Sequence, residues 1–299
     1  MSDKIIVTHA GKFHTDDVLA VAVLTLICDK RGDTYEIVRS RKSPDWERGD
    51  YVVDVGGIYD AKTNRFDHHQ EGRAGARANG IFYSSLGLVW QAYGEELCGS
   101  KEIASKLDEK LVQPIDAIDN GQSLDKSLFE GVRNYTVGDV VDIFLPTWQE
   151  ASEENFYQGF LQAVEFGRSV LVGELRQNKS VIDAREEVQK LIIEASDKRL
   201  LVSDKYFPIE GDIFEANPQI LFVIMPDVSG GWRLKTVRKG KDTFEARKDL
   251  PSAWAGKRDQ ELQELTAVSD ATFCHNALFI AGAVSKEGAV ALAKLALLD

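Results

Sequence analysis

The sequence predicts an α/β protein with a parallel-sheet N-terminal domain that has helices on both faces, a long helical connector and a smaller α+β C-terminal domain. Three observations predict this. Short apolar runs near the start of the chain are separated by helical patterns, which is typical of a parallel sheet. Residues 153–199 contain no proline and are charged, with regularly spaced apolar side chains. Beyond residue 200 the pattern changes to a hairpin, another strand and a final helix. The expected boundaries are residues 1–150, 151–199 and 200–299.

The first strand leads into a polar loop. Residues 4–9 form a short apolar run of the kind found in a strand buried on both faces. A glycine-containing loop follows, and Asp16 and Asp17 then precede the apolar stretch 18–24, which predicts a buried helix. The positive N-terminal end of a helix favours carboxylates at this place.

Two further strands are expected at 35–38 and 51–55, with Gly56 and Gly57 at the end of the second. Strands joined by helical crossovers form a parallel sheet, and such sheets carry their sites beyond the carboxyl ends of the strands. His9 and Asp54 both lie at such ends. We therefore expect these two side chains to converge, although they are far apart in sequence.

Residues 81–97 and 102–118 have the apolar spacing of helices. The end of the second helix carries Asp116 and is followed by Asp119 and by Asn120-Gly121. This pattern marks a helix end, where an aspartate is presented without competing for helix hydrogen bonds. On local evidence the two aspartates are either functional carboxylates or ordinary residues of a helix terminus. Residues 153–199 then predict one or two long helices that connect the halves of the molecule.

The C-terminal part predicts an α+β domain. Residues 220–225 and 232–237, with Ser229-Gly230-Gly231 between them, have the pattern of a hairpin. Residues 272–275 predict another strand. Residues 286–298 are rich in small side chains and predict a helix packed closely on a sheet.

The composition limits the classes of function. The 299 residues carry a net charge of -12, which disfavours a broad basic face for long duplex nucleic acid but allows a local basic groove or a short polyanion held by metal. The longest apolar run, 18–28, is shorter than the about 18 to 20 residues of a membrane span. A strand pattern from Lys4 onward leaves no room for a signal peptide, and the three cysteines lie far apart in apolar settings. A cytoplasmic location with reduced cysteines and no membrane partner is expected.

Four of the five histidines fall in two short segments, each beside carboxylates: His9, His14, His68 and His69. Imidazole and carboxylate together suit divalent ions such as Mn, Co, Zn and Mg, and the absence of nearby cysteine argues against a structural zinc site. Adjacent histidines in an extended or turn backbone point in different directions, so that one can bind metal while the other faces substrate. Metal-dependent chemistry is therefore the leading hypothesis.

Five segments in this order carry a resemblance that covers essentially the full length: residues 8–16, 52–57, 66–70, 116–121 and 230–233. With them the chain resembles the DHH phosphoesterase superfamily, named for its Asp-His-His triplet, and more closely the Myg-type (melanocyte-proliferating-gene type) exonuclease family. The resemblance implies a DHH-type fold for the N-terminal domain and two bound divalent metal ions. It implies that His9, His14 and Asp54 hold one ion, and that Asp16, Asp54, His68 and Asp119 hold the other.

The resemblance also implies roles for neighbouring side chains. In the wider superfamily the place of His14 is more often an aspartate, and the extra imidazole shifts the expected metal away from Mg towards Mn, Co or Zn, with Mn first. His69 would face the substrate as a phosphate ligand or as an acid near the leaving oxygen. Asp67 would orient His68 or His69. His69 and Asp67 are accordingly the catalytic candidates.

In the second domain the resemblance implies binding of the rest of the substrate by a glycine-rich segment and basic side chains. The candidates are His275, Gly282, Lys286 and Arg233, with the N-terminus of the last helix as a place for a phosphate. The candidate glycine-rich segment, residues 279–286, lacks the Gly-Gly and the following basic residue that relatives tend to show. The alternative is that the glycine serves ordinary strand-to-helix packing; Trp232, next to Arg233, could likewise stack on a base or belong to the core.

The function implied is that of a metal-dependent phosphodiesterase, a hydrolase that digests RNA or short oligonucleotides, most simply as a 3′–5′ exonuclease with a water activated by two metals. Two alternatives stay open. One is a phosphohydrolase of small substrates such as pyrophosphate, dinucleotides or cyclic dinucleotides, which the acidic charge favours. The other is a non-catalytic binding protein stabilised by metal. The expected partner is RNA or a short oligonucleotide, with a homodimer as an open possibility.

Overall fold

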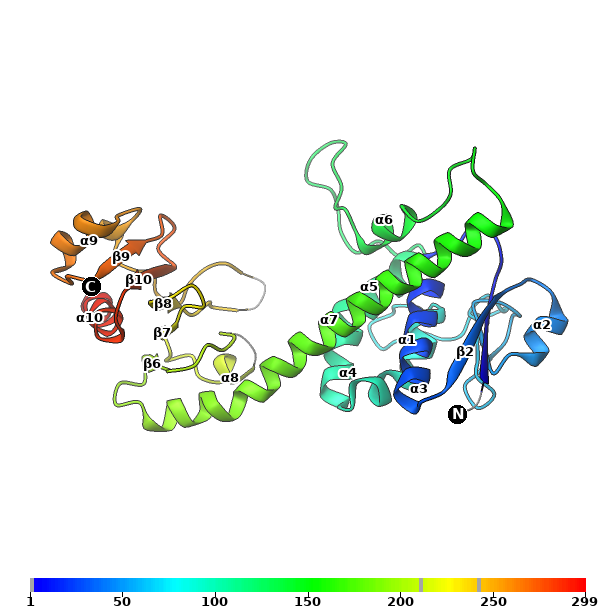
Figure 1. Cartoon of the computed structure of the whole chain (residues 1–299), viewed down its shortest axis with the longest axis horizontal. Helices are drawn as coiled ribbons and strands as arrows, with labels where there is room; N and C mark the ends of the chain where they lie inside the picture. Colours follow the sequence, from blue (N-terminus) through cyan, green and yellow to red (C-terminus); the bar gives the residue numbers. More distant parts are fainter. Residues whose placement is uncertain (1–2, 210–211, 241–242) are drawn as a thin grey trace. The chain divides into compact units, whose positions relative to one another are not determined.

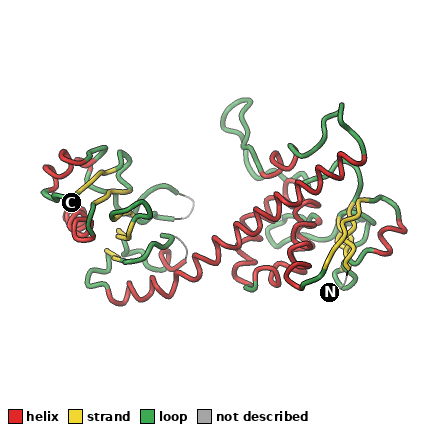
Figure 2. Tube along the Cα trace, viewed as in Figure 1, coloured by secondary structure: helices red, strands yellow, loops and turns green. Residues whose placement is uncertain are grey.

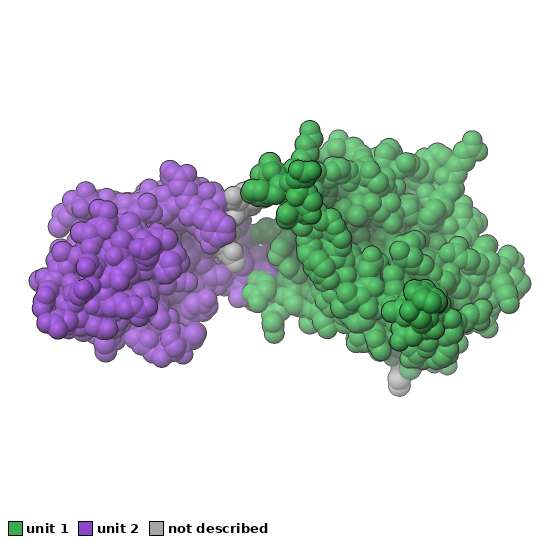
Figure 3. Space-filling view, turned by 90° about the horizontal axis from the view of Figure 1, so that it is seen from above, with its two compact units in different colours: residues 1–177 green, residues 178–299 purple. Residues whose placement is uncertain are grey.

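The computed structural model describes residues 3–209, 212–240 and 243–299 and gives a mixed α/β chain with two sheets (Figure 1). Helices, strands and loops are distinguished in Figure 2. The chain forms two compact units, Met1–Gln177 and Asn178–Asp299 (Figure 3). One continuous helix, α7 (Glu153–Glu194), contributes residues to both. The three-part division at 1–150, 151–199 and 200–299 stays a prediction. Within the described residues, no helix is both long and apolar enough to cross a membrane.

The sheet of the first unit has the strand order β2-β1-β3-β5-β4. Four strands are parallel: β1 (Asp3–Thr8), β2 (Thr34–Arg39), β3 (Tyr51–Val53) and β5 (Arg65–Phe66). The edge strand β4 (Tyr59–Asp60) is antiparallel to β5. The three strands predicted from the apolar runs are confirmed. The two-residue strand β5 was not predicted because it is too short to show a periodic pattern.

Helices lie on either side of this sheet (Figure 1). The helix α1 (Thr15–Arg31) is buried along an almost unbroken stretch, Asp16–Thr25, as its uniformly apolar sequence requires. It packs against α3 (Ser85–Cys98). On the other face, α2 (Ser43–Arg48) contributes Trp46 to a small cluster with Val7 and Val52.

The helix predicted over 102–118 has three parts: α4 (Lys101–Leu107), a π-helical turn (Asp108–Val112) and α5 (Gln113–Asp119). Sequence periodicity did not reveal the wider turn. Turns of this kind occur often at functional sites. A segment without helix or strand follows, up to the short helix α6 (Val137–Asp142) (Figure 2).

The second unit has the strand order β6-β7-β8-β10-β9. The predicted hairpin is present as β7 (Phe222–Pro226) and β8 (Trp232–Thr236), joined by β9 (Ala271–Cys274) and β10 (Ile280–Ala283) in antiparallel pairing. The strand β6 (Leu200–Val202) is parallel to β7. The helices α8 (Asp212–Glu215), α9 (Asp259–Thr266) and α10 (Lys286–Leu298), with a 3-10 turn (Ser252–Trp254), complete the unit.

A buried carboxylate ties α5 to α3. Asp116 is fully buried and accepts hydrogen bonds from the backbone N and Oγ of Ser84 at 3.2 and 2.6 Å and from the backbone N of Gly87 at 3.0 Å. The Arg77 guanidinium forms an ion pair with it at 2.5 Å. A Cβ at position 87 would lie 2.1 Å from the Asp116 carboxylate, so only glycine fits there. Of the two aspartates at this helix end, Asp116 is thus a structural anchor that holds α5 in place.

Replacement of Arg77 by alanine should lower the free energy of unfolding by about 3–5 kcal/mol, because it leaves the buried charge of Asp116 uncompensated. The measurement is urea unfolding at neutral pH. The matched control is Arg48→Ala, which removes an exposed ion pair with Asp45 and should cost about 1 kcal/mol or less. Equal stability of the two variants would contradict this account of Asp116.

Candidate metal centre

The ends of three parallel strands present polar side chains at one edge of the first sheet. His9 follows β1, Asp54 follows β3, and Asp67, His68 and His69 follow β5. His9 Nε2 lies 3.4 Å from Asp54 Oδ2, so the predicted convergence of these two side chains is confirmed.

Two helices add the remaining candidates. His14 is the N-cap residue of α1, whose first turn carries Asp16 and Asp17. Asp119 is the last residue of α5. Helix α1 therefore points its positive end at the same edge of the sheet, where it stabilises carboxylates.

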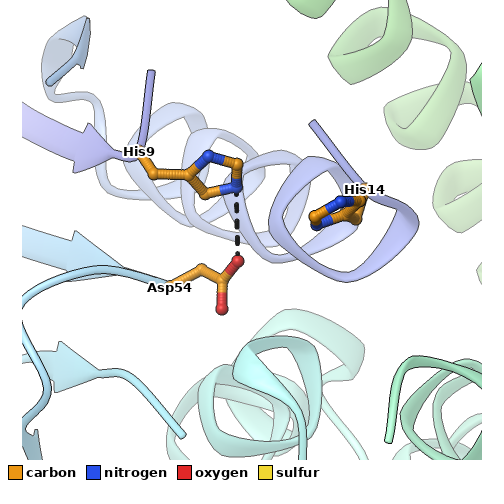
Figure 4. A group of neighbouring side chains, drawn as sticks. All are labelled: His9, His14 and Asp54. Atoms are coloured by element: carbon orange, nitrogen blue, oxygen red, sulfur yellow. Dashed lines mark ion pairs between the residues drawn. The ribbon is translucent and has the colours of Figure 1, made fainter. Parts of the chain in front are cut away.

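The first group of possible ligands consists of His9, His14 and Asp54, which approach one another in Figure 4. One ligand atom of each lies within 4.8 Å of the others. His9 and Asp54 are buried, whereas His14 is exposed. Spacing of this kind lets one cation contact all three side chains.

The second group is centred on His68. Its Nε2 atom lies 3.3 Å from Asp54 Oδ1, 3.3 Å from Asp119 Oδ2 and 4.0 Å from Asp16 Oδ2. Asp54 thus takes part in both groups. The structure brings all six predicted ligands together, while their role as metal ligands stays a prediction.

Buried polar atoms without hydrogen bonds mark this place. Among the described residues these include His9 Nε2, Asp16 Oδ1, Asp17 Oδ2 and Asp54 Oδ1. His9 Nε2 lies within ion-pair distance of Asp17 and Asp54, but not at the angles of a hydrogen bond. Unpaired buried polar atoms are costly. Because these atoms belong to side chains that gather around His9 and His68, their arrangement fits a site that binds a divalent cation.

The electrostatics of the site also favour a cation. Burial raises the pKa of Asp16 well above its usual value, and the nearby carboxylates of Asp54 and Asp119 add to this rise. Burial likewise raises the pKa of Asp119. For His9, burial lowers the pKa, but the carboxylates of Asp17 and Asp54 outweigh it and raise the pKa to about 10. The metal-free centre therefore retains protons that a bound cation would displace.

The backbone at Asp54 is unusual, with φ at 56°, in the left-handed region. Its N–H donates to the carbonyl of Phe66 at 3.1 Å, which holds the turn after β3 against the end of β5. Asp and Asn are the non-glycine residues that adopt this conformation most readily. The turn places the Asp54 carboxylate between the two histidine groups.

His69 is held by Asp67. The Asp67 carboxylate accepts hydrogen bonds from His69 Nδ1 at 2.8 Å and from the backbone N of His69 at 3.1 Å, and its other oxygen accepts from Gly57 N at 2.5 Å. The hydrogen bond that His69 donates to Asp67 raises the pKa of His69. The His69 side chain is 63% exposed, so it is free to meet a ligand.

Two residues of the site escaped the sequence analysis. Asp17 is buried, accepts from the backbone N of His14 at 2.8 Å, and lies 3.2 Å from His9 Nε2; its position beside Asp16 at the helix start was the signal. Arg41 contacts His9 Nδ1 at 3.1 Å. It follows the carboxyl end of β2, so the strand-end argument used for His9 would have found it.

The four substrate-binding candidates of the second unit do not form one cluster. Arg233 forms an ion pair with Asp227, and its guanidinium lies over the Phe273 ring. Gly282 is adjacent, and a Cβ there would lie 3.0 Å from Arg233 Nη1. Lys286 forms an ion pair with Asp204 at 2.7 Å. His275 stacks beside Phe279, with ring centroids 4.5 Å apart.

A carboxylate already lies at the N-terminus of α10, where a phosphate was expected. Asp270 accepts hydrogen bonds from the backbone N and Oγ of Ser285, the N-cap residue, at 2.7 and 2.5 Å. A Cβ at Gly288 would lie 2.1 Å from the Asp270 carboxylate. The sequence did not predict this contact, because the strands β9 and β10 lie between Asp270 and α10 along the chain.

Comparison with known proteins identifies the family. The family model MYG1_exonuc, described as an uncharacterised protein family (UPF0160), matches residues 5–297. The chain belongs to this family. The MYG1 protein YER156C of Saccharomyces cerevisiae is 34% identical over 326 residues, which cover 98% of this chain and 96% of the yeast protein. The MYG1 exonuclease of Homo sapiens is 30% identical over 328 residues, 97% of this chain and 85% of the human protein.

Among solved structures, the crystal structure of RecJ in complex with Mn2+ from Thermus thermophilus matches 99% of this chain and 52% of that chain. The sequence identity is 13% and the TM-score 0.29.

Stability of the metal-free MYG1-family chain should fall as the pH rises. The pKa of His9 is about 10 in the folded chain against the usual 6.5. Its contribution to the free energy of unfolding is therefore complete below pH 6.5 and is lost as the pH rises towards about 10. Urea unfolding with a chelator across this range measures the slope. The Asp17→Asn variant lacks one cause of the raised His9 pKa, so its stability should depend less steeply on pH. A stability that increases with pH in the wild-type chain would contradict the predicted electrostatics.

Proposed function

We propose that this chain is a metal-dependent phosphodiester hydrolase of the DHH superfamily, acting as a 3′–5′ exonuclease on RNA or short oligonucleotides. Family membership and the exonuclease name of the human relative support a nuclease or phosphoesterase. The observation that carries the proposal is the meeting of six ligand-type side chains around buried oxygen and nitrogen atoms that lack hydrogen bonds.

The donor set suits two divalent ions, with Mn the first choice and Co, Zn or Mg the others. His9, His14 and Asp54 would hold one ion. Asp16, Asp54, His68 and Asp119 would hold the other, with Asp54 between them. Such a pair of ions lowers the pKa of a bound water and neutralises charge on the phosphoryl oxygens.

The chain's own residues supply the proton chemistry. Asp67 accepts from His69 Nδ1 and so leaves the opposite ring atom, Nε2, available to the substrate. Because Asp67 also raises the pKa of His69, the protonated imidazole is available to donate to the leaving oxygen. Asp67 itself acts through His69 and is a positioning residue.

The second unit offers a surface for the rest of an oligonucleotide. A cavity of about 730 Å³ is lined by Tyr206, Phe244, Phe279, Lys235 and Arg238, among others. Phe244 is 87% exposed, and the Arg238 guanidinium lies 4.7 Å from the centre of its ring. Aromatic rings beside basic side chains suit single-stranded nucleic acid, because bases stack on rings and phosphates contact cations. This cavity supports a substrate-binding role for the second unit, and the His275 ring lies next to the ring of Phe279, which lines it.

With Mn2+ the wild-type protein should release nucleoside monophosphates from the 3′ end of a short labelled RNA. Asp54→Asn and His68→Ala should each lower this activity by more than about 100-fold. Loss of a direct metal ligand lowers activity more than loss of a residue that only hydrogen-bonds to a ligand. Parallel reactions with 5′- and 3′-labelled RNA report the direction. Glu71→Gln, an exposed carboxylate two residues after His69, is the matched control and should keep full activity.

The substrate length decides between the proposal and its alternatives. Cleavage of pyrophosphate or a dinucleotide without cleavage of a 10-mer would replace the exonuclease by a small-substrate phosphohydrolase. Absence of hydrolysis with Mn, Co, Zn and Mg alike would leave a non-catalytic protein that uses metal for stability.

Changes in the cavity of the second unit should affect long substrates selectively. Phe279→Ala and Arg238→Ala should each raise KM for a 10-mer by about 10-fold, the worth of a base stack or a phosphate contact, and leave the KM for a dinucleotide unchanged. Lys294→Ala, an exposed cation on α10, is the control. An equal effect on both lengths would argue against this surface as the binding site for the longer chain.

A further inference from the structure

A cavity of about 440 Å³ opens over the candidate metal centre of the first unit. Its walls include His9, His14, Asp54 and His69, and Arg41, which contacts the His9 ring, also lines it. Among the described residues that line it, Arg41 is the one with a permanent positive charge. The cavity thus joins the acidic centre to a single guanidinium.

Contacts with neighbouring residues fix part of the Arg41 guanidinium. Its Nε donates to the carbonyl of Ala10 at 3.0 Å, and its Nη2 lies 3.1 Å from His9 Nδ1. An arginine has five N–H donors, so about three stay without a protein acceptor here. No carboxylate among the described residues forms an ion pair with Arg41. This contrasts with Arg133 and Lys110 near the same centre, which pair with Asp139 and Glu174.

Arg41 is exposed, so its remaining donors are available to an anion that enters the cavity. Nearby carboxylates are directed at the metal-binding atoms and at His9. A planar guanidinium fits two oxygens of a phosphate at once, and such paired contacts are among the strongest in proteins. A phosphoryl group placed over the metal centre brings oxygens to this side of the cavity.

We propose that Arg41 binds the phosphoryl oxygens of the substrate and so determines how a nucleotide is seated over the metal centre. The inference rests on the proposed function, since it concerns the same site. It assigns to the segment after β2 a direct contact with substrate. The competing role for Arg41 is structural, namely to orient the His9 ring.

The test uses the full-length protein and three variants: Arg41→Ala, Arg41→Lys and Lys42→Ala. Lys42 is the exposed neighbour that does not line the cavity. Calorimetry gives the affinity for Mn2+ and then the affinity of the Mn-saturated protein for AMP. We expect Arg41→Ala to keep the wild-type Mn2+ affinity and to lose about 10- to 100-fold in AMP affinity, the worth of charge-assisted hydrogen bonds. Arg41→Lys should recover part of this loss, and Lys42→Ala should match wild type.

Two results would overturn the inference. One is a wild-type protein that binds Mn2+ but not AMP. The other is an Arg41→Ala variant that loses Mn2+ affinity while AMP binding to the metal-saturated protein is unchanged, because Arg41 would then only orient His9. The outcome is separate from that of the proposed function. Binding of AMP through Arg41 without RNA hydrolysis would defeat the exonuclease proposal alone, and RNA hydrolysis with KM and AMP affinity insensitive to Arg41 would defeat this inference alone.

Discussion

The crowding of carboxylates in one buried space is the interaction on which the rest of the first unit depends. Asp16, Asp17 and Asp54 are buried beside one another, and burying anions is costly unless they are paired. Nearby groups offset part of this cost: Ser85 Oγ donates to Asp16 at 2.6 Å, and the positive end of α1 faces the same oxygens. The two buried histidines, His9 and His68, supply further compensation. The negative charge that stays uncompensated favours binding of a cation at this site.

Much of this arrangement could be predicted because it follows from strand ends. His9 and Asp54 converge since parallel strands finish at one edge of a sheet, a rule that needs only the apolar runs. The role of β5 could not be read in this way, because a two-residue strand has no period. Arg41 was not predicted although it follows β2, because a single arginine, unlike paired histidines beside carboxylates, has no pattern that indicates a site. The sequence pattern was sufficient to identify the candidate metal ligands and insufficient to identify Arg41 beside them.

The second unit was harder to interpret, because its decisive contacts join residues that are distant in sequence. The hairpin and the last helix follow from turn residues and spacing. Gly282 instead owes its identity to Phe273, Thr272 and Arg233, which leave no space for a side chain, and nothing in the local sequence indicates this. In the same way Asp270 accepts a hydrogen bond at the N-terminus of α10, which is why we propose the aromatic and basic cavity beside Phe279, and not the helix end, as the place for substrate.

The left-handed backbone of Asp54 also limits how this position can vary. A codon change to alanine or valine would impose a backbone penalty on top of any lost ligand, since side chains other than Asp, Asn and Gly resist this conformation. Glutamate would keep the charge yet reach too far from the same Cα. Natural drift at this position is therefore confined to a very small set of amino acids, and asparagine is the substitution that separates the loss of charge from a change of shape.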